Sequence, residues 1–231
     1  MTASSSNSGF SGGSGGASPL SRGREQSRAS GNSGSSTEII ACGALAGHIR
    51  DIAARRGWPV TVRPLPARLH NRPEKIPQQA ERTVATLAPS SGSRAILAYA
   101  DCGTYGKLDE VCERTGARRL PGLHCYDILA GSDTVREMFH MEPGTYLLTD
   151  YLVRTFERTV LASLGLDRYP ELWADYFGHY TRVVWLAQEP TPELAAEAGR
   201  IAERFGLPLT TIETGVSRLE AALAELLEES E

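Results

Sequence analysis

The chain has 231 residues, of which 41% are hydrophobic and 23% are charged, a composition typical of a folded domain with one sizeable core. Its formal net charge of -4 argues against nucleic acid as a partner, because such proteins carry a basic surface. No apolar run approaches the roughly 20 residues of a membrane helix. The N-terminus also lacks the apolar core of a signal peptide, so we expect a cytoplasmic protein with no membrane partner.

The first 36 residues are dominated by Ser and Gly, with Phe10 and Leu20 as the sizeable apolar side chains. Such a segment buries too little apolar surface to offset the entropy lost on folding. We therefore expect a disordered tail over residues 1–36, followed by a single α/β domain over residues 37–231.

From residue 38 onward, short apolar runs alternate with amphipathic stretches. In the first half we expect strands over 38–43, 59–66 and 94–100, and helices over 44–57, 74–88 and 106–116. The prolines of the second strand indicate a sheet edge. In the second half we expect strands over 145–150, 182–188 and 207–214, and helices over 151–165, 169–180, 191–206 and 216–229. Thr191 is the expected N-cap of its helix.

This alternation predicts about six or seven strands in an open, mostly parallel, doubly wound (Rossmann-like) α/β sheet, with helices on both faces and room for two lobes. Ligands of such sheets bind at the carboxyl ends of the strands. Cys42, Cys102 and Asp150 are expected at such ends.

Three of the four cysteines stand where an apolar run gives way to a turn, namely Cys42, Cys102 and Cys125. Four cysteines are too few for a disulfide framework. Cys112 lies within a predicted helix and is interpreted as a packing residue. The other three thiols, with the imidazole of His124 or His70, have the ligand types of a zinc site or of a 4Fe-4S cluster with one open iron. Buried cysteines beside ordinary turns are the structural alternative.

Residues 65–77 form a polar stretch held between prolines, which stiffen the backbone. His70, Asn71, Arg72 and Lys75 together suit an anionic group, with Arg72 as a bidentate clamp and His70 as an acid, base or metal ligand. Asp101 either orients a neighbouring ligand or caps the following helix. An ordinary charged loop is the alternative for this stretch.

The segments "IIACGALAGHIR", "LPARLHNRPEKIP", "AYADCGTYGKLD", "PGLHCYDILAGSD" and "EPGTYLLTDYLVRTFER" together resemble the bacterial and archaeal domain of unknown function 1638 family, over about residues 38–227. Members of that family are often found near corrinoid-dependent methyltransferase genes, so the resemblance implies a link to one-carbon metabolism. The positions carried over are Cys42, His70, Asn71, Arg72, Asp101, Cys102, His124 and Cys125.

These observations favour a zinc-thiolate enzyme that acts on a small anionic or thiol substrate, with corrinoid-linked methyl transfer as the implied setting. One alternative is a non-catalytic accessory module that handles metal or corrinoid for a methyltransferase. Others are an iron-sulfur enzyme with three Cys ligands, and a metal-free thiol enzyme with Cys102 or Cys125 as nucleophile. The expected partners are a small-molecule substrate and a corrinoid protein or methyltransferase, and apolar helix faces also allow an oligomer.

Overall fold

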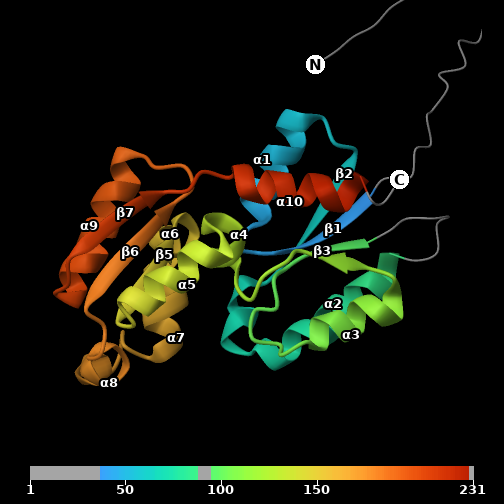
Figure 1. The fold of residues 1–231 in the computed structure, drawn as a ribbon. Coiled ribbons are helices and arrows are strands. Elements are labelled where there is room, and N and C mark those ends of the chain that lie inside the picture. Colours follow the sequence, from blue (N-terminus) through green and yellow to red (C-terminus); the bar gives the residue numbers. More distant parts are fainter. Residues whose placement is uncertain (1–36, 88–94, 229–231) are drawn as a thin grey trace, which may run out of the picture. The chain divides into compact units, whose positions relative to one another are not determined.

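The computed structural model describes residues 37–87 and 95–228. These residues belong to one compact unit, and the expected Ser/Gly tail lies outside the described part. The described residues contain seven strands in two parallel sheets with helices around them (Figure 1), which confirms the predicted α/β class. The strands are divided between a four-stranded and a three-stranded sheet.

The first sheet has the strand order β2-β1-β3-β4 and is parallel throughout. Its strands are β1 Thr37–Cys42, β2 Val60–Leu65, β3 Ala95–Ala98 and β4 Arg118–Arg119. The central strands are buried on both faces, as their unbroken apolar runs predict. Pro64 lies in β2, which is an edge strand. An edge strand tolerates a proline because it has only one neighbouring strand, and the missing proline N–H can face away from it.

Helices cover both faces of this sheet. They are α1 Ala46–Arg56, α2 Ile76–Leu87 and α3 Lys107–Thr115, with the short 3-10 helices η1 Ala67–Asn71 and η2 Pro73–Lys75 between β2 and α2. Figure 1 shows α1 on one face, and α2 and α3 on the other. Gly57 ends α1 in the left-handed conformation, with a φ of 66°, which is where the predicted helix over 44–57 ends.

The second sheet has the order β5-β6-β7 and is also parallel. Its strands are β5 Thr145–Thr149, β6 Arg182–Ala187 and β7 Leu209–Glu213. Its helices are α6 Asp150–Phe156, α7 Ala162–Leu164, α8 Trp173–Phe177 and α9 Pro192–Phe205, with the 3-10 helix η4 Pro170–Leu172 before α8. The Thr191 hydroxyl accepts a hydrogen bond from Leu194 N, which confirms the predicted cap of α9.

The predicted helix over 151–165 is interrupted. Between α6 and α7 the chain forms a π-helical segment, η3 Glu157–Leu161. Segments of this kind widen the helix locally and often occur at functional sites. Apolar periodicity does not distinguish this segment from a regular helix, because a π-helical stretch of five residues is only about one turn long and hardly shifts the pattern.

Three further helices connect the halves of the chain. They are α4 Cys125–Ala130, α5 Ser132–Met141 and α10 Ser217–Glu228. From the end of the second sheet, α10 returns to the first, where Leu219, Leu223 and Leu226 join the core formed by β1, β3 and α1. Figure 1 shows α10 beside α1. Within the described residues, no helix is long and apolar enough to cross a membrane.

One sequence interpretation is wrong. Cys125 does not mark the point where an apolar run gives way to a turn but is the first residue of α4, because β4 has only two residues and ends at Arg119. The Asp127 carboxylate accepts hydrogen bonds from Leu123 N and His124 N, and these bonds start the helix at this point. The apolar residues before Cys125 therefore belong to a connecting loop.

Candidate functional site

The strand order of the first sheet creates a crevice at the carboxyl ends of β1 and β3. The chain leaves these neighbouring strands toward β2 and β4, in opposite directions, and such a reversal point is the usual ligand site of doubly wound sheets. Cys42 is the last residue of β1, and Cys102 lies in the loop after β3. Both thiols are buried, with exposed fractions of 1% and 8%. The predicted strand-end thiols therefore occupy this crevice.

His70 lies beside Cys42. It belongs to η1, in the loop after β2, and its ring nitrogens Nδ1 and Nε2 are 3.9 Å and 3.8 Å from the sulfur of Cys42. Gly43 permits this approach, because a Cβ there would lie 2.7 Å from Leu65 O and 2.9 Å from Ala67 N. The glycine after the thiol therefore brings the turns after β1 and β2 into contact.

The orientation of the His70 ring is fixed by the backbone. Nδ1 lies 2.8 Å from the carbonyl oxygen of Ala67, and a carbonyl only accepts, so Nδ1 carries the proton of the neutral ring. Nε2 then keeps its lone pair, and the sulfur of Cys42 is about equally distant from the two ring nitrogens. A histidine that donates one ring N–H to a carbonyl and keeps the other nitrogen free is the usual arrangement of a metal ligand or a general base.

Cys102 is held in a backbone conformation that non-glycine residues rarely adopt. Its φ is 52°, and Gly103 follows with a φ of 79°. A left-handed conformation costs about 1–2 kcal/mol for a residue with a Cβ. Such outliers cluster at functional sites, where the surrounding structure maintains them. Here that structure is the Asp101 carboxylate, which accepts hydrogen bonds from the Thr104 hydroxyl at 2.9 Å, Tyr105 N at 3.0 Å and Gly106 N at 2.8 Å.

Asp101 therefore holds the turn that carries Cys102. Burial raises the pKa of Asp101, but its hydrogen bonds to the turn outweigh burial and leave the pKa below its ordinary value. A carboxylate that stays ionised and is occupied by three hydrogen bonds is a poor proton carrier. Asp101 does not cap α3, whose N-cap is Gly106 without a side-chain cap, but holds the turn that precedes this helix.

Two backbone hydrogen bonds connect the Cys102 turn to the loop before α4. Asp101 N donates to Gly122 O at 3.0 Å, and Cys102 N donates to Leu123 O at 2.7 Å. This loop leads directly to Cys125. Burial raises the pKa of Cys125, and the charges of Cys42 and Cys102 raise it further, so the three thiols are close enough to interact. In the absence of a metal, Cys125 is therefore a neutral thiol.

The imidazole of His70 responds to two of these sulfurs. Burial alone would lower the pKa of His70, but hydrogen bonds to Cys102 and Cys42 and the negative charge on those sulfurs raise it to about 11. The cluster without a metal thus favours a protonated imidazole at His70. A metal ion would take the place of the proton, because metals bind neutral imidazole and thiolate.

Tyr99 lies behind this cluster with an unpaired hydroxyl. The residue is fully buried, and its ring stacks on His70 with a centroid distance of 6.3 Å. None of the described residues gives its hydroxyl a hydrogen-bond partner. Burial, followed by the charges of Cys42 and Cys102, raises the pKa of Tyr99, which therefore remains a neutral O–H. An orphaned buried hydroxyl beside thiols indicates a further ligand in the cluster.

A cavity of about 240 Å³ adjoins the cluster and has both His70 and Cys125 on its wall. The loops of the first sheet also contribute Arg68 and Asn71. Side chains from the second half line the rest, and they are Tyr146 and Thr149 of β5, Tyr151 and Leu152 of α6, and Thr159 and Val160 of η3. The π-helical segment thus supplies part of the wall, as its unusual geometry suggests.

The other predicted site residues lie apart from the thiols. Arg72 and Lys75 are exposed and are not on the cavity wall, whereas Asn71 is. His124 is also exposed and lines a separate depression with Asp127 and Phe139. Arg68 and the cavity tyrosines were missed by the sequence analysis, although Arg68 lies only two residues before His70.

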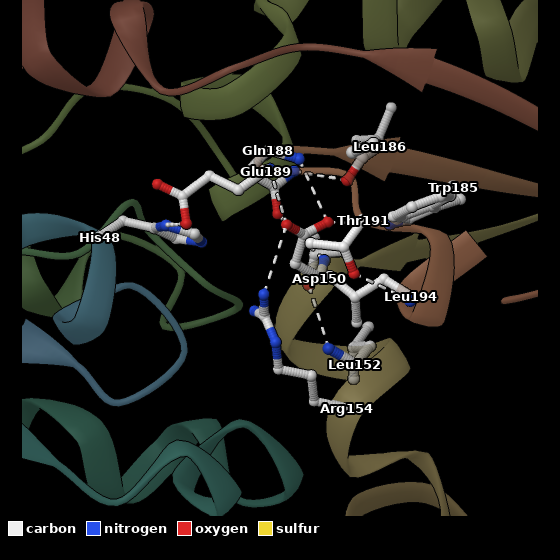
Figure 2. A network of polar contacts seen from close by, with 12 residues as sticks. His48, Asp150, Leu152, Arg154, Trp185, Leu186, Gln188, Glu189, Thr191 and Leu194 are labelled. Carbon is white, nitrogen blue, oxygen red and sulfur yellow. Dashed lines mark hydrogen bonds and ion pairs between the residues drawn. The ribbon is translucent and has the colours of Figure 1, made fainter. Parts of the chain in front are cut away.

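A second polar network lies at the carboxyl ends of β5 and β6, and Figure 2 shows it centred on Asp150. Asp150 is fully buried, and its carboxylate accepts hydrogen bonds from Trp185 Nε1 at 2.9 Å, Gln188 N at 3.2 Å and Glu189 N at 2.8 Å. The carboxylate thereby fixes the turn after β6. Arg154 is half-exposed, and its guanidinium lies 4.0 Å from the Asp150 carboxylate, so the two form a loose ion pair.

Metal-binding geometry is only partly formed in the cluster. Within residues 37–87 and 95–228, no group of three or more His, Cys, Asp or Glu side chains is arranged to hold a metal ion. However, zinc ligands at about 2.3 Å (sulfur) and about 2.0 Å (nitrogen) lie about 3.5 Å apart in a tetrahedron. The separation of Cys42 Sγ and His70 Nε2, 3.8 Å, is close to this value. However, Nδ1 lies 3.9 Å from the same sulfur, so Nε2 is not turned toward a position shared with Cys42. The donor types therefore suit zinc, whereas the present ring orientation does not yet match zinc coordination.

Comparison with known proteins gives one match. No curated protein and no solved structure matches the chain. A family model described as "Protein of unknown function (DUF1638)" matches residues 64–223, a range that contains His70, Cys102 and Cys125 and begins after Cys42. This match covers more than half of the chain and confirms the resemblance of the sequence segments. The chain belongs to the DUF1638 family.

Proposed function

We propose that the protein is a zinc-thiolate enzyme in which Cys42, Cys102 and His70 hold the metal. The observation that carries the proposal is the convergence of these side chains from the loops after β1, β3 and β2 at the reversal point of the sheet. Catalytic zinc sites have three protein ligands and an open position, whereas structural sites have four. The fixed tautomer of His70 and the strained backbone of Cys102 support a constructed site rather than chance packing.

The open position would bind and activate a small thiol or a water molecule. Zinc lowers the pKa of a bound thiol or water, so that its deprotonated form is available near neutral pH. The orphaned hydroxyl of Tyr99 would donate to a group held at the metal. Cys125 is the candidate further ligand, and His70 rather than the exposed His124 is the imidazole that the geometry favours.

The family setting makes corrinoid-linked methyl transfer the reaction to test first. A cavity of about 240 Å³ is too small to enclose a corrinoid, so the corrinoid would remain on a partner protein and the small acceptor would occupy the cavity. The described cysteines are all free thiols. Free thiols persist in reducing compartments, which supports a cytoplasmic location.

The test is metal and acid-labile sulfide analysis of full-length protein purified without oxygen. We expect about one zinc per chain, and loss of most of it in Cys42→Ser, Cys102→Ser and His70→Gln. Cys112→Ser is the matched control, because Cys112 is a partly buried thiol on α3 outside the cluster. Circular dichroism checks that each variant is folded. Metal-free wild-type protein would overturn the proposal, and iron with sulfide in place of zinc would assign an iron-sulfur cluster to the same residues.

One observation favours a second candidate, a thiol enzyme without metal. His70 Nε2 lies 3.8 Å from the sulfur of Cys42, and the pKa of His70 is raised by Cys102 and Cys42, so the imidazole is placed to support a nucleophilic cysteine as its general base or as its imidazolium partner. Alkylation by iodoacetamide after treatment with a chelator tests it. The result that favours a metal-free thiol enzyme over a zinc enzyme is a thiol that reacts fast at neutral pH in the wild type and slowly in His70→Gln. The protein used must also be shown to contain no metal as purified.

A further inference from the structure

The cavity beside the thiol cluster has an unbalanced charge. Arg68 is on its wall, and none of the wall residues is an Asp or Glu. Among the described residues Arg68 has no carboxylate partner, whereas many other arginines of this chain form an ion pair, for example Arg63 with Glu38 at 2.8 Å. The cavity therefore presents positive charge that no protein carboxylate neutralises.

The remaining wall is aromatic and carries neutral hydrogen-bond donors. Tyr126, Tyr146 and Tyr151 lie there, together with Thr149 and with Thr159, whose hydroxyl already donates to Thr155 O. Burial raises the pKa of Tyr126 and of Tyr146, so that both remain O–H groups at neutral pH. Such a wall binds a planar apolar body by stacking and donates hydrogen bonds to its polar atoms.

The volume limits the size of the ligand. A protein cavity of roughly 150 Å³ holds benzene. By this measure a cavity of about 240 Å³ accommodates a ligand of about ten non-hydrogen atoms. Nucleotides and corrinoids exceed this limit, whereas a substituted aromatic or short aliphatic acid fits.

We propose that this cavity is the binding site for a small organic anion, with the anionic group on Arg68 and the opposite end directed toward Cys125 and His70. Arg68 is a binding residue, because a guanidinium recognises a carboxylate or a similar oxyanion through paired hydrogen bonds. The inference deepens the proposed function, because it names the class of substrate, and it relies on the proposed zinc site for the reaction. Anion binding at Arg68 itself does not require the metal.

The test is calorimetric titration of full-length protein with 4-mercaptobenzoate, its uncharged isostere 4-mercaptobenzamide, and benzoate, which has no thiol. We expect Arg68→Gln to weaken 4-mercaptobenzoate binding by about 10- to 100-fold, the usual effect of losing a charged hydrogen bond, and to leave the amide unchanged. Arg72→Gln is the matched control, since Arg72 lies in the same loop but not on the cavity wall. It should bind both probes as the wild type does.

The outcomes separate this inference from the proposed function. Equal affinity for acid and amide, equal losses in the Arg68 and Arg72 variants, or no binding of any probe to wild-type protein would overturn the anion site. If any of these outcomes is found in protein that contains zinc, the anion site fails and the proposed zinc enzyme stands. If wild-type protein contains no metal but benzoate binding still depends on Arg68, the metal proposal fails and the anion site stands.

Discussion

The hydroxyl of Tyr99 gives the sharpest test of the cluster. Tyr99→Phe removes one oxygen atom from a fully buried position and keeps the ring that stacks on His70. Because none of the described residues pairs with this hydroxyl, the protein without metal carries the full cost of burying it. The substitution should therefore stabilise metal-free protein, against the usual trend for buried side chains.

The magnitude follows from the cost of an unpaired polar group. Burying such a group costs about 1–3 kcal/mol, so Tyr99→Phe should raise the free energy of unfolding of metal-free protein by about 1 kcal/mol. For a domain of this size, that corresponds to about 2–4 °C in Tm. If zinc binds as proposed, the hydroxyl would donate to a group held at the metal, and losing that bond should weaken zinc affinity by about fivefold.

The assay is thermal and urea unfolding of wild-type, Tyr99→Phe and Tyr105→Phe protein, each with a chelator and with zinc. Tyr105 is the control because it is 93% exposed, so loss of its hydroxyl should change little in either condition. The expected signature at Tyr99 is a gain in stability with the chelator that disappears with zinc, because a fivefold loss of zinc affinity offsets about 1 kcal/mol. If Tyr99→Phe destabilises metal-free protein by more than about 1 kcal/mol, the hydroxyl has a partner within the protein and the reasoning is refuted.

Two further predictions concern the carboxylates. Asp101→Asn should lower the unfolding free energy by about 1–2 kcal/mol at neutral pH, because three bonds lose their charge. Since the pKa of Asp101 is lowered from 3.8, its contribution is present above that pH and disappears as pH falls through the native value, so the two urea-unfolding curves should converge in acid. Asp150→Ala should cost about 3 kcal/mol or more, because the Trp185 indole and two amides lose their acceptor. Arg154→Ala should cost less than about 1 kcal/mol, and equal losses in the two variants would contradict the network.

The local pattern of apolar and polar residues was sufficient to predict most of the helices and strands. The apolar runs around Ile39, Leu97 and Val184 are strands, and the glycine stops and the Thr191 cap lie where residue chemistry requires them. The position of Cys42 at a strand end followed from the same reasoning. These features depend on neighbours within a few residues, which one sequence displays directly.

The pairing of loops could not be predicted in that way. His70 and Cys42 meet only because Gly43 lets two turns touch, and the loop of Cys125 is held beside that of Cys102 by backbone bonds that leave no residue pattern. Tyr99 was missed because it follows a buried strand and resembles an ordinary core aromatic. The choice between His70 and His124 likewise depended on which loop folds over the crevice.

The origin of the side chains separates two properties of the site. The cluster residues come from the loops after consecutive strands of the first sheet, whereas much of the cavity wall comes from β5, α6 and the π-helical segment η3. Changes in Thr149 or Thr159 can therefore alter which anion fits without disturbing the sulfur ligands. A site built in this way can keep one chemistry while its substrate changes, so the wall tyrosines and Arg68, rather than the cysteines, are the residues that should determine which small molecule is bound.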